Sequence, residues 1–337
     1  MTLNSERFPS GFPMIRGRRT RQSEGLRRLT EEHRLHASDF IAPLFIVEGA
    51  GKREPIVSMP GYDRLSLDFA VEKAAALFNL GIRAVLLFVQ VPGHKKDNSG
   101  REALSQESLM PRAIRALKEA LPELVVLTDV ALDPYSEYGH DGVVRDGKIV
   151  NDETLPILAQ MAVTHALAGA DMVAPSDMMD GRIGVMRQAL DARGFIDTGI
   201  MAYSAKYASC FYGPFRDALD SAPGFGDKKT YQMHPPNARE AVREALMDQA
   251  EGADMVMVKP GLAYLDIVRA VSESVQIPVA VYNVSAEYAM IKAAARQGWL
   301  NEEQAMMETL IAFKRAGAAV IATYWAGAAA ALLHELK

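Results

Sequence analysis

Eight short apolar segments, separated by stretches with helical periodicity, are the feature that most restricts how this chain folds. The segments span residues 40–47, 81–89, 124–129, 170–176, 199–206, 253–259, 278–285 and 318–325. A strand of a parallel sheet is buried on both faces and is therefore apolar along its whole length. Strands that alternate with helices are typical of βα units. Eight such units predict an α/β protein with a (β/α)8 barrel.

An open, doubly wound sheet is the alternative arrangement of the same units. No Walker A or GxGxxG sequence follows a strand, so the sequence predicts no nucleotide cofactor and favours the barrel. The length of 337 residues fits one barrel, and we assign residues 36–337 to a single catalytic domain. Helices are predicted between the strands, for example at 67–80, 110–120, 155–167, 238–250 and 301–316.

Residues 1–35 differ from the rest of the chain, because they carry six arginines between positions 16 and 28. A basic arm can bind nucleic acid, but the net charge of the whole chain is −5. We therefore interpret this segment as an N-terminal arm that packs on a neighbouring subunit of a homo-oligomer. Nucleic-acid binding is the alternative.

The composition favours a cytoplasmic protein. Cys210 is the single cysteine, which excludes an internal disulfide and is typical of a reducing compartment. Residues 1–22 contain no apolar segment of the kind that a secretory signal requires. Residues 316–333 lack charged side chains and approach the length of a membrane span. Glycines interrupt them, however, so we predict a strand followed by an alanine-rich helix.

Two lysines end neighbouring strands of the predicted barrel, where such folds carry their chemistry. Lys259 ends the sixth strand and is followed at once by Pro-Gly. Burial there lowers the pKa of a lysine and makes its amine nucleophilic; a lysine that snorkels to solvent is the alternative. Lys206 ends the fifth strand, about 4.8 Å away in a parallel sheet, so each cation disfavours protonation of the other. We predict that both amines form imines with a carbonyl substrate; the alternative is that one supplies only charge.

The other strand ends are polar as well. Asp129 ends the third strand, Ser176 the fourth and Ser285 the seventh, and Tyr324 lies at the end of the eighth. Each of these side chains donates or accepts hydrogen bonds, or transfers a proton. Together they predict a polar site at one mouth of the barrel.

The connection at 207–239 is long and rich in glycine, aromatic and cationic residues. Loops of this length without evident secondary structure are commonly lids or binding loops, and this one follows Lys206 directly. Arg216, Lys228 and Gln232 are its candidate ligands for a substrate carboxylate. An ordinary solvated loop is the alternative.

The segment after the third strand is a candidate site for a hard cation such as Mg2+. It contains Asp129, Asp133, His140 and Asp141. It has no thiolate, which excludes a zinc site with sulfur ligands. Carboxylates that are solvated or paired with cationic side chains are the alternative.

Seven motifs of this chain resemble the porphobilinogen synthase (5-aminolevulinate dehydratase) family over nearly its whole length. They read TDVALDPY, VAPSDMMDGR, MAYSAKYASCFYGPFRDA, TYQM, GADMVMVKPG, YNVSAEYAM and TYWA. The resemblance implies a (β/α)8 barrel with an arm wrapped on a neighbouring subunit, in octamers or hexamers. It also implies condensation of two 5-aminolevulinate molecules to porphobilinogen, with loss of two waters, in tetrapyrrole synthesis.

The same resemblance implies roles for individual residues. Lys259 matches the lysine that binds the first, P-side substrate as a Schiff base, and Lys206 the lysine that engages the second, A-side substrate. The positions that hold the P-side carboxylate are matched by Ser285 and Tyr324. Those that hold the A-side carboxylate are matched by Arg216, Lys228 and Gln232. Residues near the P-side amino group, where protons are transferred, are matched by Asp129 and Ser176.

Metal binding is where the chain departs from many members of that family. Zinc-type members carry three cysteines where this chain has Ala131, Asp133 and Asp141. The resemblance therefore implies the aspartate variety, without a catalytic zinc and with no organic cofactor. Glu244 matches a glutamate that binds an allosteric magnesium in some members, although an exposed helix carboxylate is the alternative. Magnesium activation and metal independence both stay open.

A Schiff-base aldolase acting on sugar phosphates is the alternative enzyme. Such an enzyme needs a phosphate site in the loops after the seventh and eighth strands. No glycine-rich turn occurs there, so the sequence favours the dehydratase.

Overall fold

The computed structural model describes residues 15–335, and the chain divides into two compact units between Arg34 and Leu35. In the first unit, a 3-10 helix spans Gly17–Arg21 and helix α1 spans Glu24–Leu29, with Ser23 as its N-cap. Neither helix has a buried residue. Residues 1–14 of the predicted arm lie outside the described residues, and its contact with a neighbouring subunit stays a prediction.

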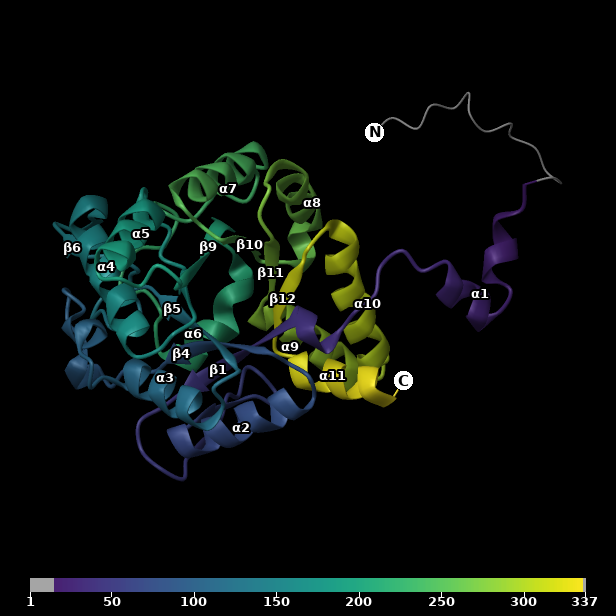
Figure 1. The fold of residues 1–337 in the computed structure, drawn as a ribbon, viewed down its shortest axis with the longest axis horizontal. Helices are drawn as coiled ribbons and strands as arrows, with labels where there is room; N and C mark the ends of the chain where they lie inside the picture. Colours follow the sequence, from purple (N-terminus) through teal and green to yellow (C-terminus); the bar gives the residue numbers. More distant parts are fainter. Residues whose placement is uncertain (1–14, 336–337) are drawn as a thin grey trace. The chain divides into compact units, whose positions relative to one another are not determined.

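The second unit is a closed barrel of eight parallel strands surrounded by helices, which confirms the predicted (β/α)8 fold (Figure 1). The barrel closes because the last strand, β12, pairs in parallel with the first, β1. An open doubly wound sheet would leave both of these edges unpaired, so that alternative is excluded. The barrel strands are β1 (Phe40–Ile46), β4 (Ala84–Val89), β5 (Val125–Val130), β8 (Met172–Pro175), β9 (Gly199–Lys206), β10 (Met255–Lys259), β11 (Val279–Asn283) and β12 (Val320–Thr323).

Seven of the eight apolar segments contain one of these strands, and β5 extends one residue beyond the segment at 124–129, in agreement with the prediction from burial on both faces. All seven residues of β1 are buried, for example. Helices whose apolar faces pack on the strands complete the outer layer. They are α2 (Leu67–Asn79), α3 (Leu109–Ala120), α4 (Asn151–Leu167), α5 (Arg182–Ala192), α7 (Arg239–Glu251), α8 (Leu265–Ser274), α9 (Ser285–Arg296), α10 (Glu302–Ala316) and α11 (Ala326–Glu335).

Glycines end two of the helices that precede strands. Gly252 follows α7 with φ 107°, and Gly317 follows α10 with φ 113°. Side chains with a Cβ rarely adopt this left-handed conformation. The chain therefore turns from helix to strand in the same way before β10 and before β12, and these parallel strands end at the same mouth of the barrel.

Two features of the connections differ from the sequence-based expectation. The connection at 207–239 is not without secondary structure, because it contains a 3-10 turn, Cys210–Tyr212, and helix α6, Gly213–Leu219. We keep the name lid for residues 207–239. The connections also contain two short antiparallel strand pairs, β2 (Arg53–Pro55) with β3 (Asp63–Leu65) and β6 (Val144–Arg145) with β7 (Lys148–Ile149).

Within residues 15–335, none of the helices is both long and apolar enough to cross a membrane.

Candidate active site

The two lysines end adjacent strands and are register partners. Lys206 ends β9, Lys259 ends β10, and the two residues pair directly across the strands. Between the pairs formed by Val256 and Val258, β9 uses three residues where β10 uses two. This bulge changes the alternation of side chains along β9. It lets Tyr203 and Lys206, three residues apart, both approach the same interior site.

Lys259 lies in a box of aromatic rings and is only 4% exposed. Its Nζ is 4.6–5.2 Å from the ring centroids of four residues, Tyr203, Tyr212, Phe215 and Tyr282. Burial, with the positive charge of Lys206 as the second cause, lowers the pKa of Lys259 from 10.5 to about 7. Ring faces attract a cation, but the loss of hydration outweighs that attraction. A pKa of about 7 leaves part of the Lys259 amine neutral at neutral pH, and its role as a nucleophile stays a prediction.

Asp129, on β5, is the carboxylate whose charge acts most strongly on Lys259. Burial raises the pKa of Asp129 to about 7, with a further contribution from the charge of Asp133. Its Oδ1 is buried and has no hydrogen-bond partner in the described part of the chain. A carboxyl group and an amine that both titrate near neutrality are suited to exchange a proton.

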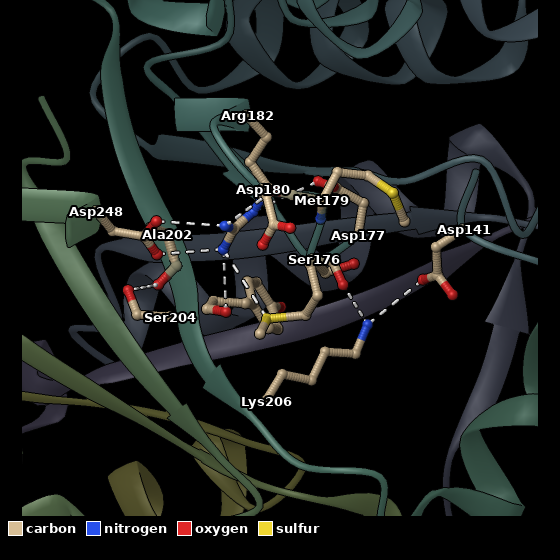
Figure 2. A network of polar contacts seen from close by, with 12 residues as sticks. Asp141, Ser176, Asp177, Met179, Asp180, Arg182, Ala202, Ser204, Lys206 and Asp248 are labelled. Atoms are coloured by element: carbon tan, nitrogen blue, oxygen red, sulfur yellow. Dashed lines mark hydrogen bonds and ion pairs between the residues drawn. The ribbon is translucent and has the colours of Figure 1, made fainter. Parts of the chain in front are cut away.

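Lys206 is held by two acceptors at the mouth of the barrel (Figure 2). Its ammonium donates to the backbone carbonyl of Ser176, which follows β8. It also lies 3.5 Å from Oδ1 of Asp141, in the loop after β5. Lys206 is 6% exposed, so its amine is directed by these contacts rather than by solvent.

Asp133 and Asp141, which we call the aspartate pair, share the ammonium group of Lys228 from the lid. Lys228 Nζ is 3.2 Å from Oδ2 of Asp133 and 2.8 Å from Oδ2 of Asp141. Burial alone would lower the pKa of Lys228, but the two carboxylates raise it. Burial alone would raise the pKa of Asp141, but Lys228 and Lys206 together lower it. Lys228 and Asp141 are therefore both charged at neutral pH.

The aspartate pair does not fit a metal ion in this arrangement. A lysine ammonium already lies between its two carboxylates. Among residues 15–335, no three His, Cys, Asp or Glu side chains are grouped so as to hold a metal. Asp133 and Asp141 are thus paired with Lys228 in this structure, and a magnesium ion at these two residues stays a prediction.

Ser285 and Tyr324 lie on the side of the site next to Lys259. Ser285 is the first residue of α9, and its Oγ accepts a hydrogen bond from the backbone of Phe215 at 3.0 Å. Tyr324 directly follows β12, and its hydroxyl lies 3.0 Å from that of Tyr282, one of the rings around Lys259. Both hydroxyls are therefore within the same polar and aromatic surroundings as the amine.

The remaining lid candidates lie on α6 and beyond it. Arg216 is partly buried on α6, and its guanidinium forms no ion pair with the described residues. Gln232 is 5% exposed, and its Oε1 has no hydrogen-bond partner in the described range. Its backbone N–H donates to the carbonyl of Lys228 at 2.9 Å. Groups left without partners in this way are available to a ligand.

Glu244 forms no ion pair with the other predicted site residues of the described chain, although it shares a cavity with Gln232. It lies on α7, 3.3 Å from the guanidinium of its neighbour Arg243. It lines a cavity of about 380 Å³ together with residues that include Asp180 and Tyr231. Burial raises the pKa of Glu244. A single carboxylate paired with an arginine does not make a magnesium site on its own.

Sequence reasoning missed the aromatic box and Tyr231. The hydroxyl of Tyr231, in the lid, donates to Oδ2 of Asp141 at 2.7 Å and lies 3.1 Å from Nδ1 of His140. Tyr231 lies in the TYQM motif next to Gln232, so this motif could have identified it as a site residue. The aromatic box is different, because its members come from β9, the lid and β11 and share no local pattern.

The fold and the site together define a class, a (β/α)8 enzyme with two buried lysines at adjacent strand ends and a carboxylate that titrates near neutrality. Comparison with known proteins identifies the family within this class. The sequence model of the family described as Delta-aminolevulinic acid dehydratase matches residues 14–332. The chain belongs to this family, and it is a lyase.

Individual relatives agree with this placement. The delta-aminolevulinic acid dehydratase of Bradyrhizobium diazoefficiens is 52% identical over 321 residues, which cover 95% of this chain and 91% of that protein. The enzyme of the same name from Bacillus subtilis is 49% identical and is covered to 98%. A crystal structure of the Toxoplasma gondii delta-aminolevulinic acid dehydratase (porphobilinogen synthase), in complex with its product porphobilinogen, superimposes with a TM-score of 0.94. It shares 50% identity and covers 97% of this chain and 93% of its own. The resemblance seen in the sequence is confirmed.

Proposed function

We propose that this chain condenses two molecules of 5-aminolevulinate to porphobilinogen, with Lys259 and Lys206 as the amines that hold the two substrates. Membership of the family supports the reaction. The observation that carries the residue assignment is the register pairing of the two buried lysines at the carboxyl ends of β9 and β10. An imine with the ketone of each substrate expels one water. The new C–C and C–N bonds then release both lysines as free amines, so two waters are lost in total.

Lys259 is the amine for the first substrate in this proposal, because its pKa is lowered to about 7. Asp129 accepts and donates protons beside it, since its own pKa is also about 7. Ser176 lies next to Asp129 and helps to place the substrate amino group. Ser285 and Tyr324 bind the carboxylate of the first substrate, supported by their position next to the aromatic box.

Lys206 is the amine for the second substrate, and the lid supplies its carboxylate site. Arg216 has no ion pair within residues 15–335, and Gln232 has an unpaired polar atom. Lys228 carries three N–H donors, so it can bind a substrate carboxylate while it keeps one contact with the aspartate pair. The substrate therefore bridges the barrel and the lid.

Trapping of the imines tests these assignments. Cyanoborohydride reduction in the presence of 5-aminolevulinate is expected to leave a mass adduct on the peptide that contains Lys259. The Lys206→Ala protein is expected to keep this adduct but to form porphobilinogen at least about a hundredfold more slowly, a typical loss for a missing catalytic group. Adduct formation on another lysine, or normal turnover of Lys206→Ala, would contradict the assignment.

We also propose that the reaction needs no catalytic zinc or organic cofactor and proceeds without a metal at the aspartate pair. The ammonium of Lys228 between the two carboxylates supports this proposal. Porphobilinogen formation, measured colorimetrically, is expected to be unchanged in EDTA. Added magnesium tests Glu244 separately, since an activation that Glu244→Gln abolishes would assign an activating site to α7.

An oligomer is proposed from the arm. The helices in its described part bury no residue, and the apolar side chain of Leu29 is 77% exposed. A second copy of the chain is the partner that would cover Leu29. Leu29→Asp is expected to reduce the mass measured by light scattering below that of the octamer or hexamer. Val57→Asp is the matched control, because Val57 is 94% exposed on the barrel unit.

The place of action is proposed to be the cytoplasm. The single cysteine supports it, whereas plant relatives such as that of Glycine max are named chloroplastic. Fractionation of the source cells followed by the pyrrole assay tests the proposal.

A further inference from the structure

A buried charged cluster, Asp177, Arg182 and Asp248, lies beside the Ser176 turn that contacts Lys206 and has no role in the reaction as described so far (Figure 2). Arg182 is 3% exposed, Asp248 3% and Asp177 0%. The three residues come from the turn after β8, from α5 and from α7. Buried ions are costly to keep unless they are paired. Here both carboxylates are paired with the guanidinium of Arg182.

The cluster controls the turn that supplies an acceptor to Lys206. Asp177 follows Ser176, and its Oδ1 accepts a hydrogen bond from the backbone of Met179 at 2.7 Å. Met178, between them, has a φ of 66°. This conformation is unfavourable for a residue with a side chain, and the Asp177 carboxylate closes the turn that contains it. The turn fixes the direction of the Ser176 carbonyl, which accepts from the Lys206 ammonium.

Arg182 connects this turn to the strand that carries Lys206. Its guanidinium donates to both oxygens of Asp248 at 3.2 Å and to the backbone carbonyl of Tyr203 at 3.2 Å. Its Nε lies 3.8 Å from Oδ2 of Asp177. Tyr203 lies in the bulged part of β9, three residues before Lys206. One planar group therefore contacts the turn, the strand and helix α7 at once.

We infer that Arg182 and Asp177 are positioning residues for Lys206, which align its amine with the second substrate by fixing the Ser176 carbonyl and the β9 bulge. This inference rests on the proposed role of Lys206. The first substrate depends on Lys259, which the cluster reaches only through the backbone of Tyr203, one of the four residues whose rings surround that amine. The two halves of the reaction are therefore expected to respond differently when the cluster is changed.

Charge alone does not replace this arrangement. A lysine ammonium in place of the guanidinium keeps the positive charge, but it has no planar fork of donors to span Asp248 and the Tyr203 carbonyl together. Asn in place of Asp177 keeps an acceptor for the turn but removes the carboxylate opposite Arg182, a group whose pKa burial raises to about 7. Arg182→Lys thus weakens the contact with the Tyr203 carbonyl on β9. Asp177→Asn weakens the contact between Arg182 and the turn after β8.

The experiment compares Arg182→Lys and Asp177→Asn with the unchanged protein in two measurements. The first is the cyanoborohydride-trapped adduct of 5-aminolevulinate on Lys259, and the second is porphobilinogen turnover. Turnover is expected to fall about tenfold to a hundredfold in Arg182→Lys, the size of loss that a misplaced catalytic group causes, while adduct formation on Lys259 falls much less. A smaller fall in turnover is expected in Asp177→Asn.

Lys118→Gln is the control, because it removes an ion pair with Asp171 at the amino ends of β5 and β8, away from the site. It is expected to lower the melting temperature without separating adduct formation from turnover. Turnover close to that of the unchanged protein in both variants, or a parallel loss of adduct and turnover, would overturn the inference. If Arg182→Lys does not fold, Asp177→Asn alone decides between these outcomes. If the unchanged protein forms no adduct on Lys259, the proposed function is wrong and this inference falls with it.

Discussion

The pH dependence of imine formation at Lys259 follows directly from its surroundings. Only the neutral amine attacks a ketone. With a pKa of about 7, about half of the Lys259 amines are neutral at pH 7, whereas a lysine with the ordinary value of 10.5 is neutral in only about one molecule in 3,000. Burial in the aromatic box thus raises the concentration of reactive amine by about three orders of magnitude.

Lys206→Met tests whether the charge of Lys206 lowers the pKa of Lys259, as we infer. The charge of Lys206 is the second cause, after burial, of the lowered pKa of Lys259, and the nearby carboxylates act in the opposite direction. Removing the cation leaves those carboxylates less compensated. The pKa of Lys259 is therefore expected to rise, and less neutral amine is expected at pH 7.

The assay is the initial rate of the trapped adduct on Lys259, measured by peptide mass spectrometry at a series of pH values on both sides of 7. In the unchanged protein, the rate is expected to rise with pH and level off above a midpoint near 7. The midpoint of Lys206→Met is expected at higher pH, and that of Lys118→Gln at the original value. A midpoint near 10 in the unchanged protein, or a downward shift in Lys206→Met, would refute the reasoning.

Two further changes test the lid. Lys228→Met leaves the aspartate pair buried without its cation, so a loss of about 3–5 kcal/mol in the free energy of unfolding is expected by chemical denaturation, and Lys228→Arg should largely prevent that loss. Gly139→Ala is expected to raise the half-saturating substrate concentration several-fold, because the added Cβ would lie 2.3 Å from the lid carbonyl of Ala222. Gly147→Ala is its control, since Gly147 also has a positive φ, of +70°, but no atom within 4 Å of the added Cβ; equal effects of the two would show that backbone strain, not the lid contact, is responsible.

Much of the scaffold could be predicted from the sequence because the relevant signals are local. Apolar runs mark strands that are buried on both faces, and the polar residue at the end of each run from the third on marks the mouth of the barrel. These two patterns alone gave the eight strands and the neighbouring positions of Lys206 and Lys259. The long connection after Lys206 was identified as a functional segment from its length, but its helix α6 was not, because seven residues carry little periodicity.

The side-chain partners in the site were decided by the tertiary structure. Simple alternation along β9 would place Tyr203 and Lys206 on opposite faces of the strand, and only the bulge brings both to one site. Likewise, the sequence shows carboxylates after β5 and a lysine in the lid, but not that Lys228 lies between them.

The sequence by itself therefore determined the barrel, the mouth at which chemistry occurs, and the pair of lysines that lies there. The tertiary structure decided which charges meet. Strand and helix periodicities depend on neighbours within a few residues, whereas an ion pair such as Arg182 with Asp248 joins residues 66 positions apart. The lowered pKa of Lys259 belongs to the second group, because burial and the charge of a neighbouring strand exist only after the barrel has closed.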